Sequence, residues 1–116
     1  MWLIKAFVII LTVHEKVLQL DERFTRGRVL VDPLAQLAIV DNRMIHLAPR
    51  EVNVMWFLSE TFISCEELCE RFFYQKGEIV NHDTAYIHIG RLKKKLPEGT
   101  LETHQYRGYR IKPQLN

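Results

Sequence analysis

The sequence is short of the residues and runs that mark secreted and membrane proteins. It has only two cysteines, Cys65 and Cys69, in 116 residues, too few for the disulfide framework of a small secreted scaffold. The apolar run from Trp2 to Val13 is interrupted by Lys5 and is shorter than the roughly 20 residues that span a bilayer as a helix. No small-residue cleavage site follows this run, as a signal peptide would require. We therefore expect a cytoplasmic protein with no membrane partner.

The chain also lacks the side-chain groupings of an active site. It shows no nucleophile paired with a base, no carboxylate dyad and no phosphate-binding loop. Cys65 and Cys69 have no further His or Cys at the spacing of a zinc site, so both are expected to be buried small hydrophobes. We predict that the protein is not an enzyme and that it carries no metal and no cofactor.

Linkers and repeats are missing as well, and the charge is unevenly spread. No Ser- or Gly-rich stretch divides the sequence, so we expect one domain, 1–116.

The formal net charge is +2, yet residues 81–112 hold seven basic and three acidic side chains, a net +4 that leaves −2 for the remainder. This asymmetry predicts an anionic partner for one end of the molecule.

The first half of the chain predicts an antiparallel meander. Turn pairs at Asp32-Pro33 and Asp41-Asn42 separate short apolar segments. The expected strands are 28–31, 37–40 and 44–47. Strand-forming residues from Phe7 to Val13 predict a further, buried strand. The segment Asp21 to Gly27 reads as a polar connection, and Lys16 to Leu20 is compatible with either a strand or a helix.

From Pro49 onward the apolar period becomes helical. Proline suits the first turn of a helix, and Trp56 in this segment is expected to belong to the core rather than to an interface. Ser64 and Glu67 have capping-box spacing, in which each side chain bonds the backbone amide of the other residue. A second helix is therefore expected to begin there, with this core-facing stripe: Cys65, Leu68, Cys69 and Phe72.

A third helix, 82–96, carries much of the basic charge. Asn81 is a suitable N-cap, and Pro97 with Gly99 ends the helix. Helical phasing predicts the buried stripe Ala85, Ile89, Leu92 and Leu96. The opposite side holds Ile87, Gly90, Arg91 and Lys94. On an isolated helix this face would be an ordinary solvated surface, but a hairpin is expected to follow at 101–111, with Arg107 near its tip.

Over residues 28–111 the sequence resembles the winged-helix DNA-binding domain of OmpR/PhoB-type response regulators and of ToxR-like transcription activators. The matching segments are Val31 to Pro33, Ile45 to Glu51, Ile63 to Leu68, Ile87 to Leu96 and Gly108 to Ile111. The resemblance implies an α+β winged helix-turn-helix fold, with an N-terminal antiparallel sheet, three helices and a C-terminal β-hairpin wing. Residues 1–26 would be an extra N-terminal segment. We expect a stand-alone domain without a receiver domain or a transmembrane segment.

The resemblance also implies a role in binding double-stranded DNA. The helix 82–96 would enter the major groove, where Arg91 would bond a guanine and Ile87 would touch a thymine methyl group. Other residues of this helix would mostly meet phosphates: Thr84, His88, Lys93, Lys94 and Lys95. The wing, 101–111, would reach the adjacent minor groove through Gln105, Tyr106 and Arg107. His88 as a solvated residue, and Tyr106 as a residue packed on the hairpin, are the alternatives to these two roles.

Asp83, Gly90 and Gln105 depart from the family pattern, so base specificity is not carried over from relatives. The resemblance further implies a bacterial transcription regulator that meets RNA polymerase through the loop 74–80. The expected contact residues of this loop are Tyr74, Gln75, Lys76, Gly77 and Glu78. It would bind DNA as a head-to-tail homodimer. We expect regulation to come either from the abundance of the protein or from a regulatory protein that binds the N-terminal segment, residues 1–26. The alternative is a winged-helix module that contacts RNA polymerase or another regulator without strong DNA binding.

Overall fold

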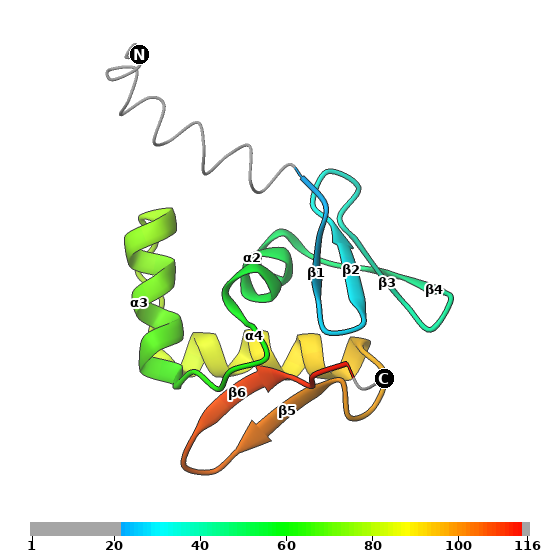
Figure 1. Cartoon of the computed structure of the whole chain (residues 1–116). Helices are drawn as coiled ribbons and strands as arrows, with labels where there is room; N and C mark the ends of the chain where they lie inside the picture. The colour runs from blue at the N-terminus through cyan, green and yellow to red at the C-terminus, as the bar shows by residue number, and fades with distance from the viewer. Residues whose placement is uncertain (1–21, 115–116) are drawn as a thin grey trace, which may run out of the picture.

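The computed structural model of the chain describes residues 22–114. Four antiparallel strands come first, and they lie in the order β1-β2-β3-β4: β1 Phe24–Arg26, β2 Val29–Asp32, β3 Leu37–Val40 and β4 Arg43–His46. Three helices follow: α2 Pro49–Phe57, α3 Cys65–Lys76 and α4 His82–Lys95. A two-stranded hairpin, β5 Leu101–His104 and β6 Gly108–Ile111, ends the described chain (Figure 1). This confirms the predicted α+β fold of sheet, three helices and C-terminal hairpin.

The predicted meander is confirmed, with one addition at its start. Asp41 and Asn42 have φ of 52° and 61°, and such a left-handed pair suits the tight turn between two antiparallel strands. The expected polar connection Asp21 to Gly27 was wrong, because Phe24–Arg26 is β1 and pairs with β2. The predictions for Phe7 to Val13 and Lys16 to Leu20 lie outside the described residues.

Distant partners explain why β1 is a strand. The Phe24 ring packs edge-on against Trp56, with centroids 5.1 Å apart. The Arg26 guanidinium donates hydrogen bonds to the carbonyl oxygens of Trp56 and Leu58, at 2.8 and 2.7 Å. The last carbonyl groups of a helix have no hydrogen-bond donor within the helix. Arg26 supplies donors to these carbonyl groups of α2 and thereby links β1 to this helix.

The helix starts follow the predicted capping signals. The Ser64 hydroxyl accepts from the Glu67 amide at 3.0 Å, and the Glu67 carboxylate accepts from the Ser64 amide at 3.0 Å. The Asn81 side chain accepts from the Thr84 amide at 2.8 Å. These bonds satisfy free amides of the first turn, so α3 and α4 begin where the sequence predicts.

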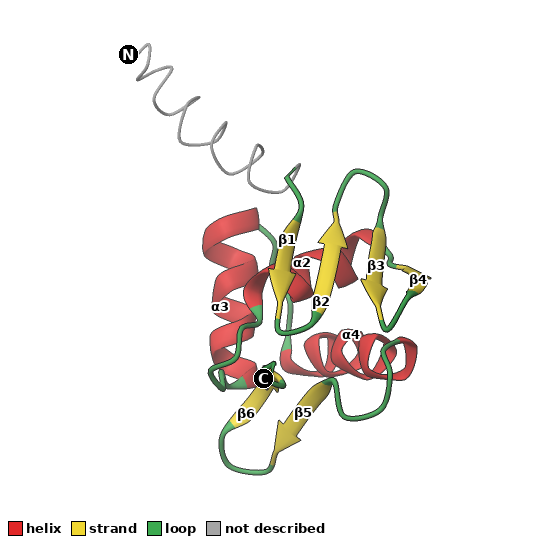
Figure 2. Cartoon of the chain, turned by 45° about the vertical axis from the view of Figure 1, so that its right-hand side comes forward, coloured by secondary structure: helices red, strands yellow, loops and turns green. Residues whose placement is uncertain are grey.

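The core lies between the inner face of the sheet and the three helices, as Figure 2 indicates. Phe57 of α2 meets Phe72 of α3 edge-on, with ring centroids 5.0 Å apart. Trp56 is half-buried and packs against this core. Cys65 and Cys69 are also half-buried, so the prediction of full burial was too strong. Burial raises the pKa of the Cys69 thiol, which disfavours the reactive thiolate.

The segment between α3 and α4 is shorter than predicted. Tyr74, Gln75 and Lys76 were expected in a loop, but they form the last turn of α3. The helix ends at Gly77, which has φ of 67°, a conformation that glycine adopts without a steric penalty. The described part of the chain contains no helix that is long and apolar enough to cross a membrane.

The hairpin is fixed to the segment between α2 and α3. Ile63 and Tyr109 exchange two backbone hydrogen bonds, of 2.9 and 2.8 Å. A side chain on Gly108 would lie 1.9 Å from the Ile63 carbonyl oxygen, so only glycine permits this close approach. The Ile111 amide adds a third bond, to the Ser59 carbonyl oxygen at 2.8 Å. These contacts set the position of the wing beside α4.

Candidate nucleic-acid interface

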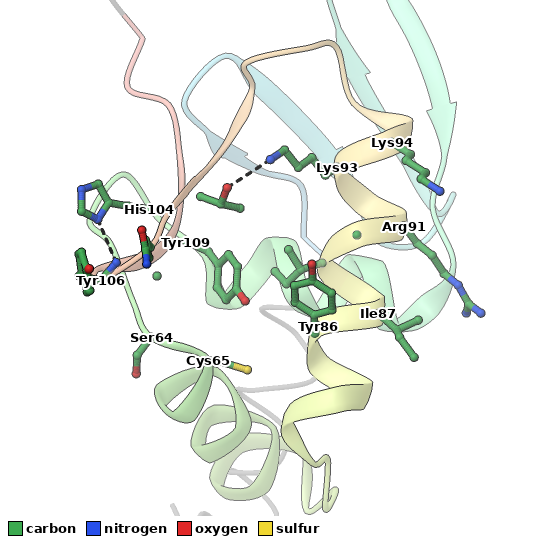
Figure 3. Close-up of a pocket in the computed structure, with 15 residues that line it drawn as sticks. Ser64, Cys65, Tyr86, Ile87, Arg91, Lys93, Lys94, His104, Tyr106 and Tyr109 are labelled. Carbon is green, nitrogen blue, oxygen red and sulfur yellow. Dashed lines mark hydrogen bonds between the residues drawn. The ribbon is translucent and has the colours of Figure 1, made fainter.

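Helix α4 divides into a buried stripe and an exposed face, as predicted. The stripe residues are each less than 5% exposed: Ala85, Ile89, Leu92 and Leu96. On the other side Ile87 is 49% exposed, and Arg91 and Lys94 are also exposed. Figure 3 shows the side chains of Ile87, Arg91 and Lys94 extending to the same side of α4. Sequence phasing thus identified the face that remains available to a partner.

A cleft of about 920 Å³ separates α4 from the wing. Six of the predicted DNA-binding residues line it: Ile87, Arg91, Lys93, Lys94, Gln105 and Tyr106. Tyr86 and Tyr109 also line it, and in Figure 3 the Tyr86 ring points toward the wing. Tyr86 is 68% exposed. Neither tyrosine was among the predicted site residues, although an aromatic residue on the edge of the basic face was a signal for Tyr86.

Two of the predicted phosphate-binding lysines are bonded to other parts of the protein. Lys93 donates to the Thr103 hydroxyl of β5 at 3.2 Å, which ties α4 to the wing. Lys95 donates to the Glu51 carboxylate at 2.6 Å and to the His46 carbonyl oxygen at 3.2 Å. The Glu51 side chain is only 4% exposed. A buried carboxylate needs a compensating partner. Lys95 therefore stabilises the fold by pairing with Glu51, in addition to any contact that it makes with phosphate.

His88 lies at the edge of the exposed face of α4 and is half-buried. Its Nε2 atom is 3.3 Å from the Arg50 guanidinium, and its ring lies 6.4 Å from that of Phe72. Burial and the nearby charges of Arg50 and Arg91 lower the pKa of His88. A neutral His88 can accept a hydrogen bond from Arg50, which also pairs with Glu78 at 3.1 Å. Sequence reasoning missed Arg50, because its partners are distant in the chain.

The remaining helix positions lie at the start and middle of α4. Thr84 is half-buried and its amide is held by the Asn81 cap, whereas Asp83 is exposed in the first turn. A Cβ atom added at Gly90 would meet no neighbour within 4 Å, so packing does not require glycine there. Gly90 lines the cleft between α4 and the wing, so the absence of a side chain leaves this part of the cleft open.

The wing tip is ordered by His104. Its Nδ1 atom accepts hydrogen bonds from the amides of Tyr106 and Arg107, both at 3.2 Å. Tyr106 is 85% exposed, and its ring lies 6.3 Å from that of His104, so this contact with the hairpin leaves most of the Tyr106 side chain open to a partner. The Arg107 guanidinium lies over the Phe62 ring at 5.8 Å, and Arg107 lines a second hollow beside Phe62 instead of the cleft. Gln105 and Tyr106 therefore line the cleft between α4 and the wing, whereas Arg107 does not.

A second exposed surface lies on α3 and the segment after it. It is apolar, with Phe73 50%, Tyr74 73% and Ile79 89% exposed. These three side chains line a shallow hollow, and Glu66 and Glu70 line it as well. Of the predicted polymerase-contact residues, Tyr74 belongs to this surface, and Gln75 and Gly77 are exposed nearby. Glu78 is occupied by Arg50, and Lys76 is half-buried at the end of α3.

Among the described residues there is no group of three or more His, Cys, Asp or Glu that could hold a metal ion. Comparison of the chain with protein-family models and with curated proteins gave no match. Solved structures do match it. The C-terminal domain of the nisin resistance regulator NsrR has a TM-score of 0.67 at 20% identity, over 78% of this chain and 96% of that domain.

Two further solved structures are similar. The Klebsiella pneumoniae RstA DNA-binding domain in complex with the RstA box has a TM-score of 0.61 at 17% identity, over 80% of this chain and 99% of that one. A C128D mutant of RitR has a TM-score of 0.64 at 21% identity, over 81% of this chain. This chain spans 45% of the RitR structure, so the likeness covers about half of that protein.

Proposed function

We propose that this chain, which has the winged-helix fold of OmpR/PhoB-type DNA-binding domains, is a bacterial transcription regulator that binds double-stranded DNA. The observation that carries the proposal is the pairing of an exposed helix face with an exposed wing across one cleft. Ile87, Arg91 and Lys94 lie on the helix side, and Gln105 and Tyr106 lie on the wing side. The local net charge of +4 in residues 81–112 suits an anionic partner.

In the proposed complex α4 enters the major groove, which is wide enough for a helix. Arg91 bonds a guanine, because one guanidinium can reach both O6 and N7. Lys94 meets a phosphate, and Lys93 does so by exchanging its bond to Thr103. Gln105 and Tyr106 then approach the neighbouring minor groove. The ordering of the wing tip by His104 supports this role, since a preformed loop loses less entropy on binding.

Binding of random duplex DNA at several salt concentrations tests the proposal. We expect affinity to fall steeply as salt rises, because each phosphate contact releases counterions. Arg91→Ala should weaken binding to a selected site by about 1–3 kcal/mol. Arg23→Ala is the matched control, since it removes an equal charge from an exposed arginine of the sheet side. If affinity does not depend on salt, the chain does not bind DNA in this way.

The apolar surface of α3 favours a second, protein-binding role. Phe73, Tyr74 and Ile79 form an exposed patch flanked by Glu66 and Glu70, and such patches often mark protein contacts. We propose that this surface meets RNA polymerase while α4 holds DNA. Ile79→Asp should then reduce activated transcription without changing DNA affinity. Loss of transcription with no detectable DNA binding by the parent chain would favour the protein-interaction module instead.

A further inference from the structure

We infer that the cleft between α4 and the wing is a binding site for a small planar aromatic anion, such as an aromatic carboxylate, and that this ligand competes with DNA. The aromatic ring would lie between Tyr86 and Tyr109, and the anionic group would meet Lys93. The ligand site itself does not depend on the proposed function. Only the competition rests on it, because competition requires that the chain holds DNA between α4 and the wing.

The wall of the cleft on α4 combines an aromatic ring, an open position and a cation. Tyr86, Gly90 and Lys93 line the cleft, and their spacing of four and three residues places them in one row along the helix. In Figure 3 Lys93 extends toward the wing, whereas Arg91 extends to the other side of α4. A Cβ atom added at Gly90 would meet no atom within 4 Å. Space therefore remains between the ring and the cation, whose positions are about 10 Å apart along the helix axis.

The facing wall, on the wing, carries a second tyrosine beside a hydroxyl group. Thr103 of β5 and Tyr109 of β6 are directly paired across the hairpin, and both line the cleft. Directly paired residues have their side chains on the same face of a sheet. Lys93 donates to the Thr103 hydroxyl at 3.2 Å, so this is the face toward α4. Figure 3 shows the rings of Tyr86 and Tyr109 on the two sides of the space between α4 and the wing.

Part of this lining is screened from solvent, as a ligand site requires. Ile89 is 2% exposed, and Cys65 and Tyr109 are half-buried. Burial raises the pKa of Tyr109, so its phenol stays protonated and can donate a hydrogen bond to an anion. Ligand pockets in proteins usually have about 300–1,000 Å³ and are lined by aromatic side chains with a few polar groups. The cleft, at about 920 Å³, has this size and this lining.

The chemistry of the two walls selects the class of ligand. A flat ring can stack against tyrosine rings, and the Lys93 ammonium favours an anionic group through a charge-assisted hydrogen bond. Neither Tyr86 nor Tyr109 has a role in the proposed DNA complex. The bases of a duplex are stacked on each other and are not free to enter the cleft, so the DNA backbone would use the charge but not the rings. A small aromatic anion uses both.

Occupation of the cleft would weaken DNA binding for two reasons. The ligand engages Lys93, which meets a phosphate in the proposed complex, and it places a negative charge between α4 and the wing. Like charges at this distance repel. The coupling is reciprocal, so DNA lowers the affinity for the ligand by the same factor.

Titration of the full chain with 2-naphthoate tests the site, with calorimetry to measure affinity and NMR to locate the probe. We expect one saturable site per chain, with shifted amide signals for Tyr86, Gly90 and Thr103. Two related compounds separate the two kinds of contact. 2-Naphthamide has the rings without the charge, and cyclohexanecarboxylate has the charge without an aromatic ring. Each should bind about tenfold more weakly than 2-naphthoate.

Variants of the cleft test which side chains make the site. Tyr86→Ala should weaken binding of 2-naphthoate about two- to tenfold, and Lys93→Gln should weaken it about tenfold. Tyr74→Ala is the matched control, since it removes a tyrosine that is 73% exposed on α3, and it should bind like the parent chain. Gly90→Met fills the open position and should block binding. Because methionine favours a helix more than glycine does, urea denaturation should show no loss of stability in this variant.

The affinity of the chain for a labelled duplex at low salt, with and without saturating 2-naphthoate, tests the competition. The probe should lower the DNA affinity of the parent chain and of Tyr74→Ala about fivefold or more. The DNA affinity of Gly90→Met should be the same with and without the probe. Comparing each variant with itself removes any direct effect of the substitution on DNA binding.

The opposite results separate the ligand site from the proposed function. If 2-naphthoate does not saturate the parent chain, or binds Gly90→Met equally well, the ligand site is wrong, whereas salt-dependent DNA binding would still support the proposed function. Binding of the probe with unchanged DNA affinity would overturn the competition. Binding of the probe by a chain that binds no duplex at any salt concentration would overturn the proposed function and the competition, and would support the ligand site.

Discussion

Gly108→Ala is the substitution whose cost follows most directly from the structure. Gly108 has φ of 105°, and an added Cβ would lie 1.9 Å from the Ile63 carbonyl oxygen. That oxygen accepts from the Tyr109 amide, and the Ile63 amide donates to the Tyr109 carbonyl oxygen. The wing therefore has to move away from the segment before α3, and both hydrogen bonds are lost.

The expected cost has two parts. A left-handed backbone costs a residue with a side chain about 1–2 kcal/mol, and each lost hydrogen bond costs about 0.5–1.5 kcal/mol. Together these lower the free energy of unfolding by about 2–5 kcal/mol. Gly99→Ala isolates the first part, since Gly99 has φ of 84° and nothing within 4 Å of the added Cβ. That control should lose only about 1–2 kcal/mol.

Urea denaturation of both variants measures the difference, with hydrogen exchange as a local readout. In Gly108→Ala alone, the amides of Ile63 and Tyr109 should exchange faster, because their mutual bonds are broken. The reasoning would be refuted if Gly108→Ala were no more destabilising than Gly99→Ala. Equal stability with unchanged exchange would mean that the wing is not held at this point.

Two further predictions concern side chains of α4. Lys95→Met should lower the free energy of unfolding by about 1–3 kcal/mol, because it leaves the buried Glu51 carboxylate without its cation. Lys94→Met is the control at an exposed lysine, and its free energy of unfolding, measured by urea denaturation, should change by no more than about 0.5 kcal/mol. The folded state lowers the pKa of His88, so its contribution to stability is complete above the unfolded pKa of about 6.5 and is lost as pH falls toward the folded pKa. His88→Gln should therefore flatten the decline in stability between neutral and mildly acidic pH, and an unchanged decline would contradict this account.

Local sequence signals predicted much of the fold. The Ser64 and Glu67 capping box, the Asn81 cap and the buried stripe of α4 all depend on residues within a few turns of each other. The turn at Asp41 and Asn42 is similarly local. Such patterns can be read from the chain alone, and for that reason the sides of α4 were assigned correctly.

Features that depend on distant partners were not predictable in the same way. Arg26 finds its carbonyl partners 30 and 32 residues along the chain, so β1 looked like a polar connection. Lys95 resembled any exposed lysine of a basic face, but a buried carboxylate 44 residues earlier holds it. Charge and phasing show where a basic side chain points, but they do not show whether it is already paired.

The bridge between Ile63 and Tyr109 has a consequence for any duplex that the domain holds. Because the wing is bonded to the rest of the protein, the span between Ile87 on α4 and Tyr106 at the wing tip is set before binding. The domain would then fit only a duplex whose groove spacing matches this fixed distance between α4 and the wing tip. A duplex with a different groove spacing must bend or twist to fit, and the energy of this deformation depends on base pairs that no side chain touches.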